Sequence, residues 1–115
     1  QGDSWCAYWA TMLGDIVYEG RFPLGRTGSC DVLLQRGKDR GWLTKVPAVG
    51  DLYLLLRSPV DAHHTGIVVG LNGNTFEEIS GNTNEDGSSN GIGVFRKERP
   101  ITDSTIFIHY DRVAS

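Results

Sequence analysis

Five residues of this chain could supply a nucleophile and a base, namely Cys6, Cys30, His63, His64 and His109. A thiolate attacks carbonyl carbon, and an imidazole can hold the thiolate as an ion pair and later return a proton to a leaving amine. Cys6 falls in the first turn of a predicted helix, where unpaired backbone amides favour the thiolate. Cys30 falls in an apolar helical stretch typical of a core thiol. We therefore expect Cys6 to be the nucleophile.

The base is expected on a strand of the second half of the chain. His64 directly precedes an alternating segment, residues 65–69, so its ring can project beyond the edge of a sheet. Neighbouring side chains on a strand point to opposite faces, so only one of His63 and His64 can face the helix. The spacing alone leaves the choice between them open.

The first helix is predicted over Trp5–Leu13, because this segment lacks Gly and Pro and carries one apolar stripe. The stripe has the spacing i, i+3, i+4, i+7 and consists of Trp5, Tyr8, Trp9 and Met12. Asp3 or Ser4 can cap its N-terminus, and Gly14 offers the left-handed conformation that commonly ends a helix. A second helix is expected from Cys30 to about Lys38, with Ser29 as its cap and Gly41 closing the region.

Strands are predicted after residue 50, because β-branched and aromatic residues dominate there and Gly, Asn or Pro interrupts at short intervals. They are expected at Asp51–Arg57, His64–Leu71, Thr75–Ile79, Gly91–Arg99 and Thr105–Tyr110. The turn Asn72-Gly73-Asn74 makes the second and third of them antiparallel. Helices followed by strands predict an α+β fold, with the helices packed on an antiparallel sheet of about five strands.

Length and composition limit the possible functions. The 115 residues, 39% of them hydrophobic, suit a single domain covering 1–115. The longest apolar run, residues 52–56, is far too short for a membrane span. A net charge of −3 with scattered basic residues argues against nucleic acid as a partner. Two cysteines without a CxxC pattern favour reduced thiols over a disulfide framework.

Four short segments occur in an order that resembles a known family. They are Trp5-Cys6-Ala7, Pro47-Ala48-Val49-Gly50-Asp51-Leu52, His64-Thr65-Gly66-Ile67-Val68 and Gly81-Asn82-Thr83-Asn84. Together they resemble the CHAP domain of cysteine- and histidine-dependent amidohydrolases and peptidases, which is related to NlpC/P60 and more distantly to papain. The resemblance runs from residue 5 to about residue 110.

This resemblance implies a papain-like or NlpC/P60-like fold and an enzyme without a cofactor. It implies that the chain hydrolyses amide bonds in the peptide part of bacterial peptidoglycan through a thioester at Cys6. It also selects His64, directly before Thr65-Gly66, as the base. Such an enzyme would act outside the cytoplasm, secreted or delivered by a phage, with targeting supplied by another segment or a delivery partner.

The third catalytic member departs from the family pattern. Relatives often carry Glu-Gly-Asn where this chain has Ser80-Gly81-Asn82. We assign the role to Asn82, whose amide oxygen can orient the imidazole as the asparagine of papain-like enzymes does. Ser80 is a rival, and a shifted register could let Glu77 or Glu78 substitute, although both glutamates are more simply solvated charges on an exposed strand.

Other chemistries fit the sequence less well. Residues 82–87 imitate the first half of a calcium loop, but Gly93 stands where a bidentate glutamate is required. The adjacent pair His63-His64 rarely converges on one ion, so no metal is expected. Trp5, Tyr8, Trp42 and Tyr53 could line a substrate groove, but most of them are expected in the core.

Two further functions use the same residues differently. An acyltransferase would keep the Cys6–His64 pair and transfer the acyl group to an amine instead of water. A catalytically weakened cell-wall-binding or interaction module would keep only the fold, and the missing acid at Ser80 is its best support.

Overall fold

The computed structural model describes residues 5–82 and 93–110, which form helices packed on an antiparallel sheet. The helices are α1 (Trp5–Val17) and α2 (Cys30–Arg40). The strands are β1 (Leu43–Thr44), β2 (Leu52–Ser58), β3 (Asp61–Asn72), β4 (Thr75–Asn82), β5 (Gly93–Pro100) and β6 (Thr105–Ile108). The strand order is β1-β6-β2-β3-β4-β5, and all neighbours are antiparallel. The predicted α+β class is confirmed, and the papain-like topology stays a prediction.

The described sheet has six strands instead of about five. The additional strand, β1, contains only Leu43 and Thr44, which pair with Ile108 and Phe107 of β6. Two residues are too few to show an alternating pattern, so tertiary pairing alone creates this strand.

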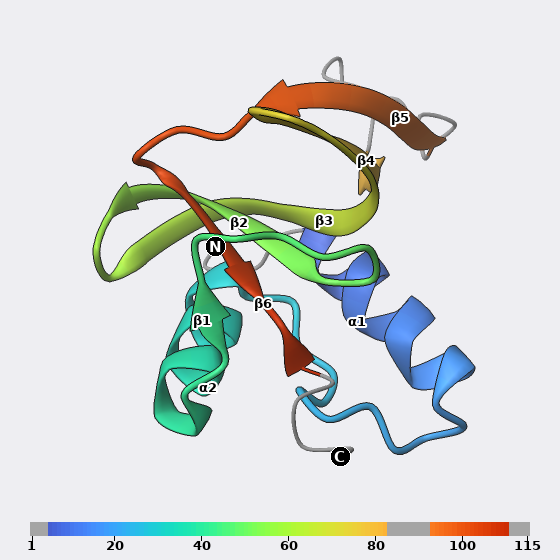
Figure 1. Cartoon of the computed structure of the whole chain (residues 1–115). Coiled ribbons are helices and arrows are strands. Elements are labelled where there is room, and N and C mark those ends of the chain that lie inside the picture. Colours follow the sequence, from blue (N-terminus) through green and yellow to red (C-terminus); the bar gives the residue numbers. More distant parts are fainter. Residues whose placement is uncertain (1–4, 83–92, 111–115) are drawn as a thin grey trace.

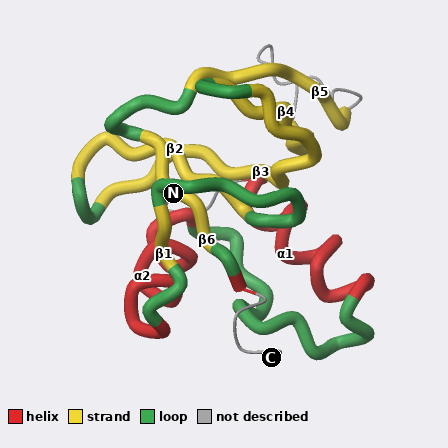
Figure 2. The backbone as a smooth tube through the Cα atoms, viewed as in Figure 1, coloured by secondary structure: helices red, strands yellow, loops and turns green. Residues whose placement is uncertain are grey.

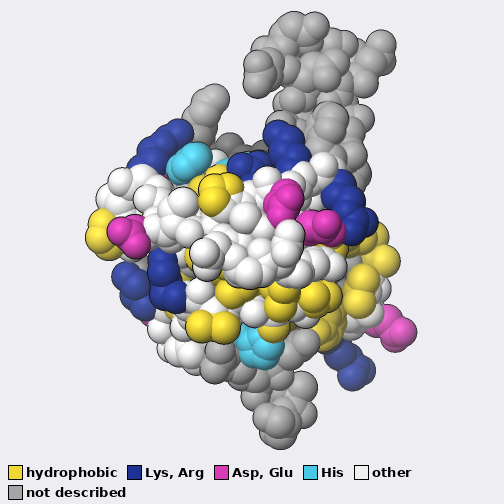
Figure 3. All heavy atoms as spheres, turned by 45° about the horizontal axis from the view of Figure 1, so that its top comes forward, with side chains coloured by type: hydrophobic (Ala, Val, Ile, Leu, Met, Phe, Trp, Pro, Cys, Tyr) yellow, Lys and Arg dark blue, Asp and Glu magenta, His cyan; other side chains and the backbone are white. Residues whose placement is uncertain are grey.

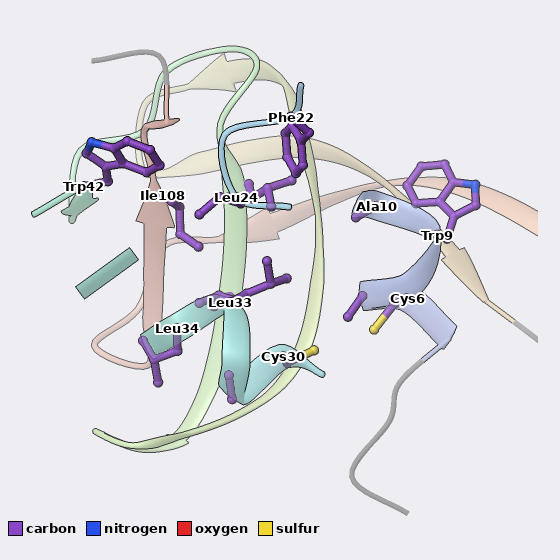
Figure 4. Close-up of a cluster of buried hydrophobic side chains, with 14 residues drawn as sticks. Cys6, Trp9, Ala10, Phe22, Leu24, Cys30, Leu33, Leu34, Trp42 and Ile108 are labelled. Atoms are coloured by element: carbon purple, nitrogen blue, oxygen red, sulfur yellow. The ribbon is translucent and has the colours of Figure 1, made fainter. Parts of the chain in front are cut away.

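Both helices lie on the same side of the sheet (Figures 1 and 2). Between them and the sheet lies the larger core cluster, in which Cys6 of α1 and Cys30 of α2 are buried with Leu33, Leu52 and Leu54 (Figure 4). Because side chains alternate along β2, Tyr53 points the other way and packs in a smaller cluster with Val68, Phe76 and Phe107. The sheet therefore has a helix face and a second, opposite face.

The helix ends show which predicted caps form. Ser29 accepts a hydrogen bond from the Val32 amide, and Gly41 ends α2 in the left-handed conformation with φ 72°, as expected. The predicted end of α1 at Gly14 is wrong, because the helix continues to Val17. A Cβ at Gly14 would stand 2.6 Å from Cε1 of Phe22, so this glycine serves close packing instead of helix termination. Asp3 and Ser4 lie outside the described residues.

The strands agree with the prediction in order and differ at their ends. Asn72 pairs with Thr75, which confirms the antiparallel hairpin. β3 begins at Asp61, ahead of His64, and β4 continues past Ile79 to Asn82. Ser80 and Gly81 are poor strand formers, but they pair with Phe95 and Val94 of β5. This pairing extends β4 beyond its predicted end. β5 is described from Gly93, so the expected start at Gly91 lies outside the described residues, and β6 ends at Ile108 instead of Tyr110.

Neither described helix has the length and apolar character that a bilayer span requires.

Candidate active site

Cys6 lies in the first turn of α1, where the sequence placed it. Its side chain is 6% exposed and belongs to the cluster between the helices and the sheet (Figure 4). α1 packs against β3 and β4, the two strands that carry the histidine pair and the candidate third members. Helix position and neighbouring strands thus fit a nucleophile activated at a helix N-terminus.

A β-bulge decides which way the two histidines point. Leu55 pairs with His64 and Leu56 pairs with Ala62, so His63 is the extra residue. Ala62 belongs to the helix-side cluster, and Asp31 of α2 accepts a hydrogen bond from its amide at 2.7 Å. Leu55, directly opposite His64, packs against the cluster of Tyr53. His64 therefore stands on the face of the sheet that the helices do not cover.

The contacts of His64 lie on that second face. Its Nε2 atom is 3.4 Å from Nη2 of Arg99, and its ring centroid is 5.9 Å from that of Tyr53. The structure does not bring Cys6 and His64 together, because the sheet separates them. The assignment of His64 as the base stays a prediction.

His63 lies near several charged groups, Cys6 among them. Its side chain is largely exposed, yet its remaining burial is the largest cause of a pKa below the ordinary value. The positive charges of Arg57 and His64 lower this pKa further. The negative charges of Asp61 and the Cys6 thiolate act in the opposite direction and raise it. In Figure 3, Lys and Arg side chains lie beside a histidine at the top of the molecule, and others lie at its left and lower right.

Glu78 is fully buried, which corrects the expectation that it is a solvated charge. Its Oε2 atom accepts a hydrogen bond from Nε of Arg99 at 2.7 Å, whereas its buried Oε1 atom has no well-aligned hydrogen-bond donor in the part of the chain that the structure describes. The hydroxyl of Tyr53 is also buried and forms no well-aligned hydrogen bond among the described residues. Phe76 and Glu78 share a face of β4 by alternation, so the aromatic residue two positions before Glu78 is the sequence signal that could have indicated a buried face.

Glu77 matches the expectation of a solvated charge. It pairs with Arg96 at 2.5 Å, and the two side chains are 44% and 65% exposed. Glu77 is on the opposite face of β4 from Glu78, and its pairing partner on β3 is Gly70. Its side chain is therefore not next to His64.

The other proposed third members lie at the end of β4. Ser80 is buried, two residues beyond Glu78 and on the same face. Continuing the Ile67–Ile79 register by three residues along each strand brings Asn82 opposite His64. The side chain of Asn82 lies outside the described part of the chain, so its hydrogen bond to the imidazole stays a prediction.

Asp51 and His109 form an acid–histidine pair that no sequence pattern indicates. Oδ1 of the buried Asp51 is 2.6 Å from Nδ1 of His109, and its Oδ2 atom accepts a hydrogen bond from the Ala48 amide at 2.9 Å. The pair ties the turn before β2 to the residue after β6. Asp51 is in the Pro47–Leu52 segment of the resemblance, and this geometry gives it a structural role.

Among residues 5–82 and 93–110, no group of three or more His, Cys, Asp or Glu side chains could hold a metal ion. Most of the calcium-like segment, residues 83–87, lies outside those ranges. Trp42 and Tyr53 are core residues, as expected for most of the aromatics, whereas Tyr8 is 46% exposed and contacts Arg26.

Searches against protein-family models, curated proteins and solved structures find no significant match for this chain.

Proposed function

We propose that this chain is a cysteine amidohydrolase in which Cys6 is the nucleophile and the adjacent histidines His63 and His64 supply the base. One observation carries the proposal: Cys6 lies in the first turn of a helix that packs on β3, the strand that carries both histidines. The negative charge of its thiolate is the smallest of the influences on the pKa of His63 and acts against the overall lowering. The sequence resemblance supplies the substrate class, amide bonds in the peptide part of peptidoglycan.

Different arguments support His63 and His64 as the base. The resemblance favours His64, whereas the described arrangement places His63 within reach of the charge of Cys6. A bulge is a place where one residue is accommodated outside the regular pairing, and a shift by one residue exchanges the faces of neighbouring side chains. His64 can act on Cys6 only if the bulge moves by one position along β3.

The reaction follows from the thiolate and the imidazolium. The thiolate attacks the amide carbonyl, and the backbone amide of Cys6, at a helix start, is placed to donate to the developing oxyanion. The imidazolium gives its proton to the leaving amine as the C–N bond breaks, which leaves a thioester. The neutral imidazole then takes a proton from water, whose hydroxide attacks the thioester and releases the acid and the thiolate.

Asn82 is proposed to orient the base through its side-chain oxygen, with Ser80 as the alternative. The support is the strand register, which brings Asn82 opposite His64 when continued from Ile67–Ile79. Loss of an orienting group lowers the rate by orders of magnitude and leaves some activity. Asn82→Ala should therefore lower kcat far more than Ser80→Ala, and a near-normal rate in Asn82→Ala would contradict the assignment.

The decisive experiment incubates purified peptidoglycan with the protein and identifies new termini by mass spectrometry. Wild type should release fragments, and Cys6→Ala should release none. His63→Ala and His64→Ala identify the base, because only one of them should be inactive. Cys30→Ala is the matched control, since Cys30 is also buried but begins α2 and should keep activity. A folded wild-type protein that releases no fragment would overturn the proposal.

One observation favours a second function, a binding module of the same fold. His64 is engaged by Arg99 on the face away from Cys6, as in a site that no longer needs a base. Sedimentation with intact peptidoglycan, without any new termini, would support that function. Products carrying an added amine instead of water would indicate the acyltransferase.

A further inference from the structure

A cavity of about 550 Å³ opens between α2, β1, β2 and the turn that leads into β6. Its apolar lining comes from Leu34, Leu43, Leu56, Pro59 and Ile106. Three of these side chains, Leu43, Leu56 and Ile106, pack against the core from one side and are only partly buried. A volume of this size is in the range of ligand-binding pockets, and its apolar floor suits a hydrocarbon chain.

The charges around the cavity are mostly positive. Lys38, Lys45 and Arg57 line it, and among residues 5–82 and 93–110 Asp103 is its only acidic lining residue. The Nζ atom of Lys45 donates to the carbonyl oxygens of Thr102, Asp103 and Thr105 at 3.3, 3.2 and 2.5 Å, so Lys45 holds one wall together.

The other two cations are available to a ligand. Lys38 and Arg57 are exposed on α2 and β2, and within the described residues neither side chain forms a hydrogen bond or an ion pair. An apolar floor beside two such cations is complementary to a molecule with an aliphatic chain and a negatively charged head.

We propose that this cavity binds a small aliphatic carboxylate, with its chain on the leucine and isoleucine side chains and its carboxylate at Lys38 and Arg57. A cationic amphiphile is disfavoured, because its head would meet two like charges. The cavity lining contains neither Cys6 nor a histidine, so the inference does not depend on the proposed hydrolase.

The test titrates sodium octanoate into the isotopically labelled full chain and follows methyl signals by NMR. The methyl groups of Leu34, Leu43, Leu56 and Ile106 should shift in a saturable way. Each buried methylene contributes about 0.8 kcal/mol, so hexanoate should bind about 15-fold more weakly than octanoate. Octylamine should bind more weakly than octanoate.

Charge variants test the head-group site. The double variant Lys38→Gln/Arg57→Gln should weaken octanoate binding about five- to thirtyfold, as expected for two exposed charge contacts. Lys97→Gln is the matched control, because Lys97 is an exposed cation on β5 outside the cavity. Octanoate affinity unchanged in the double variant, octylamine binding as tightly as octanoate, or shifts confined to other residues would each overturn the proposal. The octanoate–octylamine comparison uses wild type and holds even if a variant fails to fold.

Discussion

Arg99 holds the fully buried carboxylate of Glu78, with 2.7 Å between Nε and Oε2. The arginine side chain is 24% exposed, so only one partner of this pair remains in contact with solvent. Removing one partner of a buried pair leaves a charge without compensation, which costs about 3–5 kcal/mol. Arg99→Leu should therefore lower the free energy of unfolding by about that amount in urea.

The matched control for Arg99→Leu is Arg96→Leu. Arg96 pairs with Glu77 on the neighbouring positions of the same strands, but both side chains are largely exposed. Exposed pairs contribute about 0–1 kcal/mol, so Arg96→Leu should change stability little. Equal losses in the two variants would show that Glu78 is not buried as described.

Gly66, the third residue of the His64-Thr65-Gly66 segment, leaves no room for a side chain. A Cβ there would stand 2.6 Å from the carbonyl oxygen of Ile79 and 2.7 Å from Cε2 of Tyr53. Because one obstacle is backbone, Gly66→Ala should force a shift of β3 and cost about 1–3 kcal/mol or more. Urea unfolding monitored by circular dichroism measures this loss.

Gly70→Ala provides the comparison for Gly66→Ala on the same strand. Its Cβ would meet the Oε1 atom of Glu77 at 3.0 Å, and this 44% exposed side chain, although paired with Arg96, can shift toward solvent more easily than a backbone carbonyl. We expect a loss well below that of Gly66→Ala. If the two substitutions cost the same, the close approach of Tyr53 to Gly66 is wrong.

The residue patterns predict the positions of the helices and strands better than they predict which side of each element is buried. Aromatic spacing located α1, and the Gly73 turn located the β3–β4 hairpin, because both signals are local. Gly14 was misread as a helix end because its reason, contact with Phe22, comes from a distant segment. The two-residue β1 had no pattern of its own and exists through pairing with β6.

The candidate site shows the same limit. The sequence predicts the position of Cys6 in the first turn of α1. The orientation of His64, however, depends on a β-bulge that no local sequence pattern predicts. Burial of Glu78 depends on Arg99, which lies 21 residues away in the chain. Alternation with Phe76 favours a buried face for Glu78, whereas its acidic side chain predicts exposure to solvent.

Tyr53 should make stability fall at alkaline pH. Burial is the largest cause that raises the pKa of Tyr53 well above its ordinary value. A hydrogen-bonding interaction with the side chain of Glu78 and the negative charge of Glu78 raise it further. The folded state therefore keeps the phenol proton above pH 10, where the unfolded state loses it. Stability is complete below pH 10 and falls as pH rises, by about 1.4 kcal/mol per pH unit for this group.

Tyr53→Phe removes this alkaline loss. At neutral pH the variant should be slightly less stable than wild type, because Glu78 and Arg99 act on the hydroxyl of Tyr53, which forms no well-aligned hydrogen bond among the described residues. Urea unfolding of both proteins between pH 8 and 11 gives the comparison, since all other ionisable groups are the same in both. Parallel loss of stability in the two proteins would show that Tyr53 titrates normally.

The titration of His63 reports which histidine neighbours the nucleophile. In wild type the pKa of His63 should lie below its ordinary value, because burial and the charges of Arg57 and His64 disfavour the imidazolium. The Cys6 thiolate favours the imidazolium, so Cys6→Ser, which removes that charge, should lower the pKa of His63 further. Arg57→Gln should raise it.

NMR titration of the imidazole signals measures all three proteins, and His109, paired with Asp51, serves as the internal control. If Cys6→Ser instead changes the titration of His64 and leaves His63 unaffected, His64 is the partner of Cys6 and the bulge lies one residue away from the position described.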